Sequence, residues 1–272
     1  LDYIVWMVTV CAGALAFIGY GYWHGQQNNK QLEQIGFNAP DAAALQRMDL
    51  ASFTVDWDAL RAINPDVVGW IYVPGTTVNF PIVHGTDDEH YLKTDFYGQT
   101  SWVSFGSIFL SAANAADFSD ANSIVYGHHM NDGSMFSPFA DFGDADTFNG
   151  HRTVYVFTPT ANYQLTTFSI VHCAADDPLA QTAFASEQER QAYVQDKVDR
   201  SVVTVAGLPS AADMKHTFAF STCDNLASNG RWVLFAYESG STAAASSVVA
   251  DDSNINPEDV AAVSEAAKET AA

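Results

Sequence analysis

The sequence predicts a mainly β protein, folded as a closed or nearly closed antiparallel barrel of eight strands and preceded by one apolar helix. Eight short runs rich in β-branched and aromatic residues recur between turn signals, and one late helix interrupts them. Many short strands with few helices favour closure, because a barrel leaves no strand edge unpaired. The predicted strands are Val68–Val73, Val78–Val83, Ser107–Leu110, Ser123–Tyr126, Thr153–Phe157, Tyr163–His172, Thr217–Ser221 and Trp232–Tyr237.

The chain opens on an apolar segment. Tyr3–Trp23 contains no charged residue, and at 1.5 Å per residue it is long enough to cross a hydrocarbon core of about 30 Å. It predicts a single transmembrane anchor over residues 1–24, followed by a juxtamembrane helical segment over residues 25–52. A cleaved signal peptide stays open as the alternative, because Ala14–Ala16 offers a small-x-small cleavage site.

Two helices are predicted within one folded domain over residues 53–238. In Trp57–Ile63, large apolar residues recur every three positions and therefore share one helix face. The second helix is Ser186–Arg200, which begins with a Ser-x-x-Glu capping-box pattern. Residues 239–272 are acidic and rich in alanine, and they offer little apolar surface to bury. We expect this tail to be disordered.

The composition excludes several classes of protein. Among 272 residues, 32 are acidic and 11 are basic, which gives a formal net charge of −21. Such a chain repels nucleic-acid phosphates, so no nucleic-acid partner is expected. Three cysteines are too few for a disulfide-stapled small fold or a four-thiolate zinc site. No cofactor is predicted, and the acidic clusters Asp87–Glu89 and Asp141–Asp146 are interpreted as solvated loops without the ligand spacing of a calcium site.

Three side chains that suit acyl transfer are predicted to converge at one rim of the barrel. Cys223 follows the strand Thr217–Ser221, and Arg231 begins the next strand, so a hairpin would place the guanidinium beside the thiol. There it favours the thiolate and can donate hydrogen bonds to an oxyanion. His128 follows another strand end, after Gly127, whose small size would let a backbone or ligand approach closely. A thiol, an imidazole and a guanidinium together form an acyl-transfer site.

Each of these residues also has a structural interpretation. A lone cysteine at a strand end is commonly a small buried apolar residue, and Cys173 and Cys223 could instead form a disulfide. The pair His128 and His129 could bind a metal, but no further histidine lies at a familiar ligand spacing, so no metal site is predicted. Arg231 alone is compatible with an ordinary surface position.

Several short motifs, taken in order, resemble those of the class B sortases. The matching segments are Asn64–Thr76, Gly106–Leu110, Tyr126–Met130 with Gly133–Phe136, and Ser221–Cys223 with Arg231. Each is short, but the set in this order is specific. The resemblance covers Phe53–Glu238. The helix Ser186–Arg200, between two late strands, matches the feature that separates class B from shorter sortases.

The resemblance implies an eight-stranded sortase barrel, tethered by its N-terminal helix to the outer face of the membrane of a Gram-positive bacterium. It implies a cysteine transpeptidase that cuts a C-terminal sorting motif of secreted proteins and transfers the acyl group to an amine of a peptidoglycan precursor or a pilin subunit. Matched by motif, Cys223 is the nucleophile, His128 the catalytic histidine and Arg231 the third catalytic residue. His129 is then only a neighbour, and Ser221 helps to hold the substrate.

Two other functions are compatible with the same residues. A secreted cysteine peptidase would use the thiol and the imidazole but would hydrolyse the acyl-enzyme. A non-catalytic binding module, held by a disulfide between Cys173 and Cys223, would use neither. The products formed in the presence of an amine distinguish the peptidase from a transpeptidase. Titration of free thiols distinguishes the disulfide-held module from an enzyme with a free cysteine.

Overall fold

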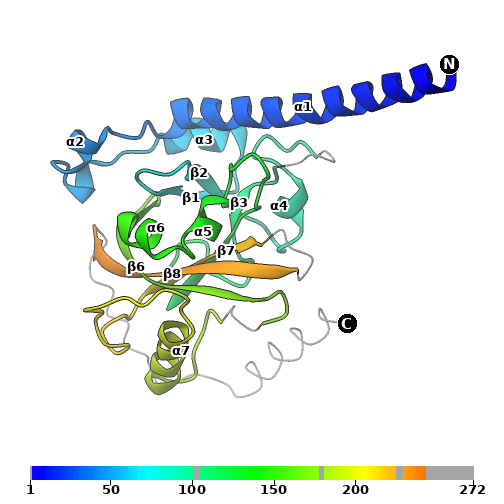
Figure 1. Ribbon diagram of the computed structural model, residues 1–272. Helices are drawn as coiled ribbons and strands as arrows, with labels where there is room; N and C mark the ends of the chain where they lie inside the picture. The colour runs from blue at the N-terminus through cyan, green and yellow to red at the C-terminus, as the bar shows by residue number, and fades with distance from the viewer. Residues whose placement is uncertain (1, 101–104, 178–180, 225–228, 243–272) are drawn as a thin grey trace.

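The computed structural model describes residues 2–100, 105–177, 181–224 and 229–242. Its strands are β1 Val67–Tyr72, β2 Asn79–His84, β3 Ile108–Leu110, β4 Asn122–Tyr126, β5 Thr153–Phe157, β6 Asn162–Ala174, β7 Thr217–Cys223 and β8 Gly230–Ser241. They close into one barrel in the order β1-β2-β3-β4-β7-β8-β6-β5 (Figure 1). The predicted eight-stranded barrel is therefore confirmed.

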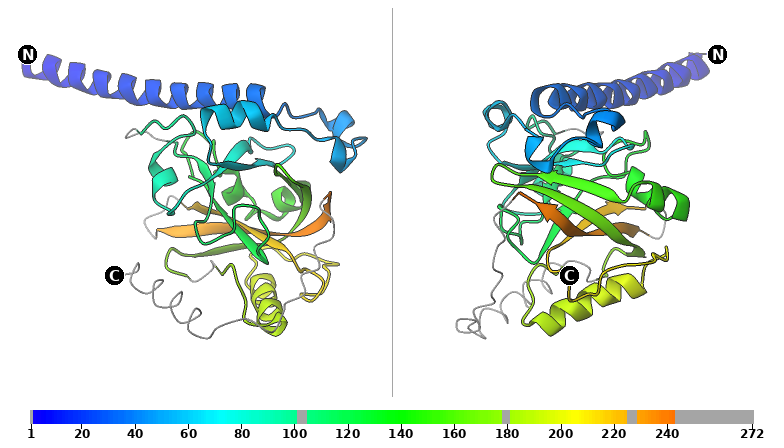
Figure 2. Two further views of the ribbon diagram at one scale, coloured as in Figure 1. Left: turned by 180° about the vertical axis from the view of Figure 1, so that it is seen from behind. Right: turned by 90° about the vertical axis from the view of Figure 1, so that its left-hand side faces the viewer.

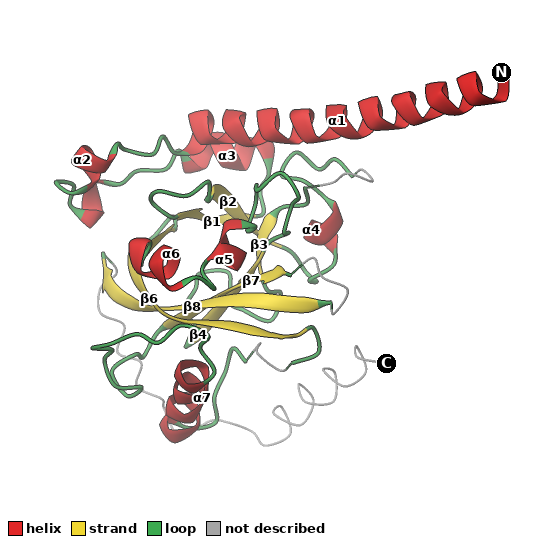
Figure 3. Cartoon of the chain, in the orientation of Figure 1, coloured by secondary structure: helices red, strands yellow, loops and turns green. Residues whose placement is uncertain are grey.

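The barrel is mixed, not antiparallel. β2 runs parallel to β3, and β4 runs parallel to β7, while the other neighbours are antiparallel. The prediction of an antiparallel barrel was wrong at these two pairs. Parallel neighbours need a long crossover. The connection from β2 to β3 contains α4, and the connection from β4 to β7 contains β5, β6 and α7. Figure 3 shows β4, β7 and β8 side by side in the barrel wall.

The helices lie outside the barrel. They are α1 Asp2–Gly36, α2 Ala42–Leu45, the short 3-10 helix Leu50–Ser52, α3 Trp57–Ile63, α4 His90–Lys93, α5 Pro138–Asp141, α6 Ala145–Gly150 and α7 Glu187–Asp199. The views from front, back and side place α1 and α7 on opposite sides of the barrel (Figures 1 and 2). As predicted, Ser186 caps α7 by accepting from the Glu189 amide. The Glu189 carboxylate bonds the Ala185 amide, one residue before the position expected for a capping box.

The alternation along β7 decides which side chains reach the barrel surface. Phe218 and Phe220 are fully buried in the barrel interior. Ala219 points outward and packs with Val194 of α7 in a separate apolar cluster. Because side chains alternate along a strand, Cys223 lies on the same outward face of β7 as Ala219.

α1 consists of a projecting half and a docked half. Its first half is apolar and exposed, with Tyr3 71% and Leu15 70% accessible. Within the described residues, α1 is the helix that is long and apolar enough to cross a membrane. Its second half packs on the barrel, where Leu32 is only 2% exposed. The helix continues without interruption from the predicted anchor through to Gly36.

The two acidic clusters have structural roles that the sequence interpretation missed. Asp87 accepts from the amides of Glu89 and His90 at the start of α4, and Asp144 accepts from the Thr147 amide to cap α6. Capping a helix satisfies amides that otherwise lack a partner. Asp87–Glu89 form a loop outside any helix, as predicted, and this loop bonds the first amide of α4. The prediction of a loop was wrong for Asp141–Asp146, which include the end of α5 and the start of α6.

The C-terminal boundary is only partly described. β8 continues to Ser241 and pairs with β6 up to that residue, so the strand extends past the predicted domain limit at residue 238. Residues 243–272, which hold most of the predicted disordered tail, lie outside the described residues.

Candidate active site

Cys223 and Arg231 lie opposite each other at the end of the β7–β8 pair. The antiparallel register pairs Cys223 directly with Arg231, and Thr222 with Trp232. Directly paired residues project to the same face of a sheet. The thiol and the guanidinium therefore share the outer face of the barrel, whereas Thr222 and Trp232 project to the other face.

His128 leaves the sheet beside Cys223 because β4 runs parallel to β7. Tyr126 pairs with Ser221, and the Gly127 amide donates to the Ser221 carbonyl over 3.1 Å. His128 and Cys223 stand two residues further along their respective chains. All three predicted catalytic candidates therefore meet at one rim of the barrel.

The structure distinguishes the two adjacent histidines. His128 Nε2 lies 2.6 Å from the Leu92 carbonyl oxygen, whereas His129 Nδ1 lies 2.9 Å from the carbonyl oxygen of Cys223. A carbonyl oxygen only accepts hydrogen bonds, so each of these nitrogens carries a proton. Nδ1 of His128 is then the nitrogen that can exchange a proton with a reacting group. In the described part of the chain, no group of three or more His, Cys, Asp or Glu side chains is arranged to hold a metal ion.

The backbone at the start of β8 holds the guanidinium of Arg231. Its Nη1 donates to the carbonyl oxygens of Gly230 at 3.0 Å and of Asn229 at 3.3 Å. The side chain is half-buried. A donor that is already held in place needs little reorganisation when negative charge develops beside it.

Gly127 is needed for packing and not for the approach of a ligand. A Cβ atom at this position would lie 2.5 Å from Ile108 Cδ1 and 2.7 Å from the ring of Phe136. Both of these side chains are buried in the barrel core. The interpretation of Gly127 as a gap for a backbone or ligand was therefore wrong, because buried side chains fill that space.

A small cavity of about 110 Å³ adjoins Arg231 on the outer face of the barrel. Its walls are Ile124, Tyr126, Cys173, Ala174, Ala175, Asp177, Ser221, Arg231 and Val233. Ser221, singled out from the sequence, is one of these walls and is 8% exposed. Tyr126 was not selected from the sequence, although it directly precedes the Gly-His-His motif. It lies two residues after Ile124 and therefore on the same face of β4. Burial, together with the charge of Asp88, raises the pKa of Tyr126 to about 12, so its hydroxyl stays neutral.

Cys173 and Cys223 cannot form a disulfide in this fold. β8 separates their strands, because Arg231 pairs with Cys223 on one side and with Cys173 on the other. Two strand spacings amount to roughly 10 Å, whereas a disulfide needs Cα atoms within about 7 Å. Both thiols are free. Burial, with a smaller contribution from Asp177, raises the pKa of Cys173 to about 11. The disulfide-held module predicted as an alternative was therefore wrong.

Comparison with known proteins identifies the family. No family model matches the chain. It is 29% identical to sortase B of Listeria monocytogenes over 224 residues, covering 80% of this chain and 88% of that protein. It is 30% identical to sortase B of Staphylococcus aureus over 169 residues, covering 62% of this chain and 68% of that protein. The chain belongs to the sortase B family.

A solved structure supports this sortase assignment. The crystal structure of sortase B from B. anthracis in complex with AAEK1 superposes with a TM-score of 0.68 at 27% identity, covering 80% of this chain and 98% of that structure. The predicted resemblance to class B sortases is thus confirmed, and so is the eight-stranded barrel. The protein is a sortase-type cysteine transpeptidase.

The sequence interpretation of this sortase missed a hydrogen-bonded pair, His172 and Asp224, next to Cys223. His172 Nε2 lies 2.9 Å from Asp224 Oδ2, and the His172 ring stacks on Trp232 with centroids 4.4 Å apart. Asp224 is 6% exposed and directly follows Cys223. Its place next to the motif cysteine was the only available signal, because the partner lies 52 residues away in the sequence.

Proposed function

We propose that this sortase cleaves a C-terminal sorting motif of secreted proteins at Cys223 and transfers the resulting acyl group to an amine. The observation that supports this proposal is the strand register, which brings Cys223 opposite Arg231 and beside the strand end that carries His128. These are the groups that nucleophilic acyl transfer needs: a nucleophile, an oxyanion donor and a proton carrier.

In the first half-reaction, the Cys223 thiolate attacks the carbonyl carbon of the scissile peptide bond. Negative charge moves to the carbonyl oxygen, and the guanidinium of Arg231 stabilises it by donating hydrogen bonds. The C–N bond then breaks, and the departing amine takes a proton from His128 Nδ1. The product is a thioester between the substrate and Cys223.

In the second half-reaction, an acceptor amine attacks the thioester carbonyl. His128 Nδ1 takes the proton that the attacking amine loses, which restores the imidazolium. The C–S bond breaks, and Cys223 leaves as the thiolate. The Leu92 carbonyl at Nε2 keeps the ring in one orientation through both half-reactions, because it always accepts from that nitrogen.

We assign substrate binding to the outer face that carries Ser221. Ser221 and Tyr126 are walls of the cavity next to Arg231, and a chain lying there would present its carbonyl to the guanidinium. The secreted substrate and the amine acceptor, on a peptidoglycan precursor or a pilin subunit, follow from the family resemblance.

We further propose that α1 is a single-pass membrane anchor and that the catalytic domain lies outside the cell. The exposed apolar half of α1 supports this assignment. Mass spectrometry of the protein from membranes tests it: a mature chain that begins after Ala16 would replace the anchor with a cleaved signal peptide.

The transpeptidase proposal is tested with a sorting-motif peptide and a series of amines. We expect an amide product whose yield rises with the amine concentration. A diaminopimelate-type peptidoglycan peptide and a lysine-containing pilin peptide, offered in parallel, separate the two classes of acceptor. Hydrolysis as the sole outcome with every amine would instead favour the cysteine-peptidase alternative.

The role of the nucleophile is tested by two matched cysteine variants. Cys223→Ala should abolish the acyl-enzyme seen by intact mass, whereas Cys173→Ala should retain it. Both replace a half-buried cysteine at the same rim, and each pairs with Arg231. Equal losses in the two variants would show that the nucleophile is misassigned.

A further inference from the structure

The docked half of α1 contacts the two segments that surround His128. One segment runs from α4 to β3 and supplies the Leu92 carbonyl that holds the His128 ring. The other follows His128 in the chain and folds back over it, since the Phe136 amide donates to the His128 carbonyl over 3.0 Å. α1 therefore reaches the surroundings of the imidazole from two directions.

Phe105 is the contact with the first segment. The rings of Tyr22 and Phe105 meet edge to face with centroids 5.6 Å apart. Gly25 lies so close to the Phe105 ring that a Cβ atom there would overlap it. Phe105 is 5% exposed. The close packing of α1 against this ring therefore depends on the absence of a side chain at residue 25.

Gly106, the residue after Phe105, transmits this packing to His128. It adopts a φ of +55°, which favours glycine. A Cβ atom on Gly106 would lie 2.7 Å from the Tyr91 carbonyl oxygen, 2.8 Å from that of Leu92 and 3.0 Å from His128 Cδ2. The backbone at residue 106 thus fills the space between α4 and the imidazole, and a shift of this backbone would move one or both.

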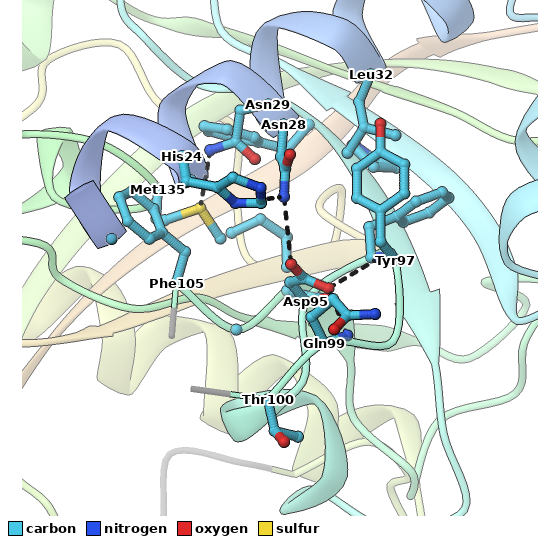
Figure 4. A pocket seen from close by; sticks show the side chains of 18 of the residues that line it. His24, Asn28, Asn29, Leu32, Asp95, Tyr97, Gln99, Thr100, Phe105 and Met135 are labelled. Atoms are coloured by element: carbon cyan, nitrogen blue, oxygen red, sulfur yellow. Dashed lines mark hydrogen bonds between the residues drawn. The ribbon is translucent and has the colours of Figure 1, made fainter. Parts of the chain in front are cut away.

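The second segment is tied to α1 by polar contacts. Gln26 Nε2 donates to Asp132 Oδ2 over 3.0 Å, and Asn29 Nδ2 lies 3.7 Å from Met135 Sδ. Met135 forms an isolated bridge with His129, the residue beside the catalytic histidine. Figure 4 shows Asn29 pointing from α1 toward Met135, with Phe105 close by in the same pocket wall.

We propose that the docked half of α1 is a positioning element for His128, and that Gly25, through Phe105 and Gly106, is its principal positioning residue. The inference rests on the proposed role of His128 in proton transfer. α1 would then affect the reaction rate by fixing the position of the His128 imidazole, in addition to any role as a membrane anchor. Among the described residues, none of those that line the cavity beside Arg231 belongs to α1, so the proposed effect of the helix is on the imidazole.

Three glycines of the same helix provide a matched test. Gly25→Ala would push on Phe105, Gly36→Ala would push on Trp70 and Leu60 at the other end of the docked half, and Gly19→Ala meets nothing within 4 Å. Each change adds one methyl group to α1 and raises its helix propensity. Each variant is assayed as the full chain in detergent, with a sorting-motif peptide and an amine.

Gly25→Ala should lower kcat by about 10- to 100-fold, as expected for a small misplacement of a catalytic group, and should leave KM unchanged. Gly19→Ala should match the parent protein. Gly36→Ala should lower the melting temperature without a comparable loss of kcat. Phe105→Leu added to Gly25→Ala should restore kcat, because the smaller side chain makes room for the methyl group.

Two outcomes would overturn the inference. The first is full kcat in Gly25→Ala, which would show that the Phe105 ring turns into the neighbouring cavity of about 250 Å³ that it lines and that its packing does not position His128. Alternatively, Gly25→Ala and Gly36→Ala would lower kcat only in proportion to their loss of stability. His128→Ala keeps the two proposals apart: an active His128→Ala variant refutes the proposed function, whereas an inactive one beside a fully active Gly25→Ala variant refutes the positioning role alone.

Discussion

The pair of His172 and Asp224 is expected to stabilise the end of β7, which carries Cys223. Asp224 is buried, its carboxylate accepts from His172 over 2.9 Å, and its amide donates to the Gly230 carbonyl over 3.0 Å. Asp224→Ala removes this hydrogen bond from an imidazole whose side chain is 36% exposed, so water replaces part of it and the net cost is about 0.5–1.5 kcal/mol. For a domain of this size, such a loss corresponds to a fall in melting temperature of roughly 1–6 °C.

Asp224→Asn separates the hydrogen bond from the charge. The amide oxygen of asparagine can still accept from a protonated His172 Nε2, so this variant should keep most of the stability that Asp224→Ala loses. Chemical denaturation monitored by tryptophan fluorescence measures the stability of both variants, since Trp232 stacks on His172. If Asp224→Ala unfolds at the same denaturant concentration as the parent protein, the pair contributes nothing and the reasoning fails.

Three further predictions concern a hydrogen-bonded carboxylate, a buried thiol and a close-packed glycine. His216 donates to Glu238 and holds the pKa of that carboxyl below its usual value, so this stabilisation is present above about pH 4.5 and is lost as the pH falls further. The difference in unfolding free energy between the parent protein and Glu238→Gln should therefore shrink as the pH falls from about 4.5 to about 3. At pH 8, iodoacetamide should label Cys223, the proposed nucleophile, long before Cys173, whose pKa of about 11 leaves roughly one thiol in a thousand ionised. Equal labelling of the two cysteines in a peptide map would contradict this. Gly127→Ala should cost about 1–3 kcal/mol by overpacking, whereas Gly150→Ala meets open space and should not; similar unfolding midpoints for the two would contradict the packing account.

Local sequence patterns predicted the strands and the β7–β8 hairpin well. Alternation and turn residues located all eight strands, and the short interval between Cys223 and Arg231 was enough to predict their pairing, because a hairpin is set by nearby residues. The same reasoning located α7 from its capping pattern. The motifs that resemble class B sortases lie on these local elements, which explains why a single sequence was sufficient to suggest the family.

Features that depend on distant segments were predicted poorly. No local pattern says that β4 and β7 run parallel, since 90 residues separate the start of β7 from the end of β4. Cys173 and Cys223 looked like a plausible pair until the order of the strands placed Arg231 between them. The space around Gly127 is filled by Ile108 and Phe136, whose positions only the closed barrel defines. In each case, the missing information was which strand lies next to which.

The uninterrupted course of α1 limits how the enzyme can be oriented. A flexible linker would let the barrel turn freely above a membrane. A helix that continues without a break into its docked half instead fixes both the rotation of the barrel about the helix axis and its distance from the membrane. Each residue inserted upstream of Tyr22 would turn the barrel by about 100° and raise it by about 1.5 Å. An anchored enzyme of this design would present its catalytic rim in one fixed direction, so a substrate held in the same bilayer would meet it at a defined angle.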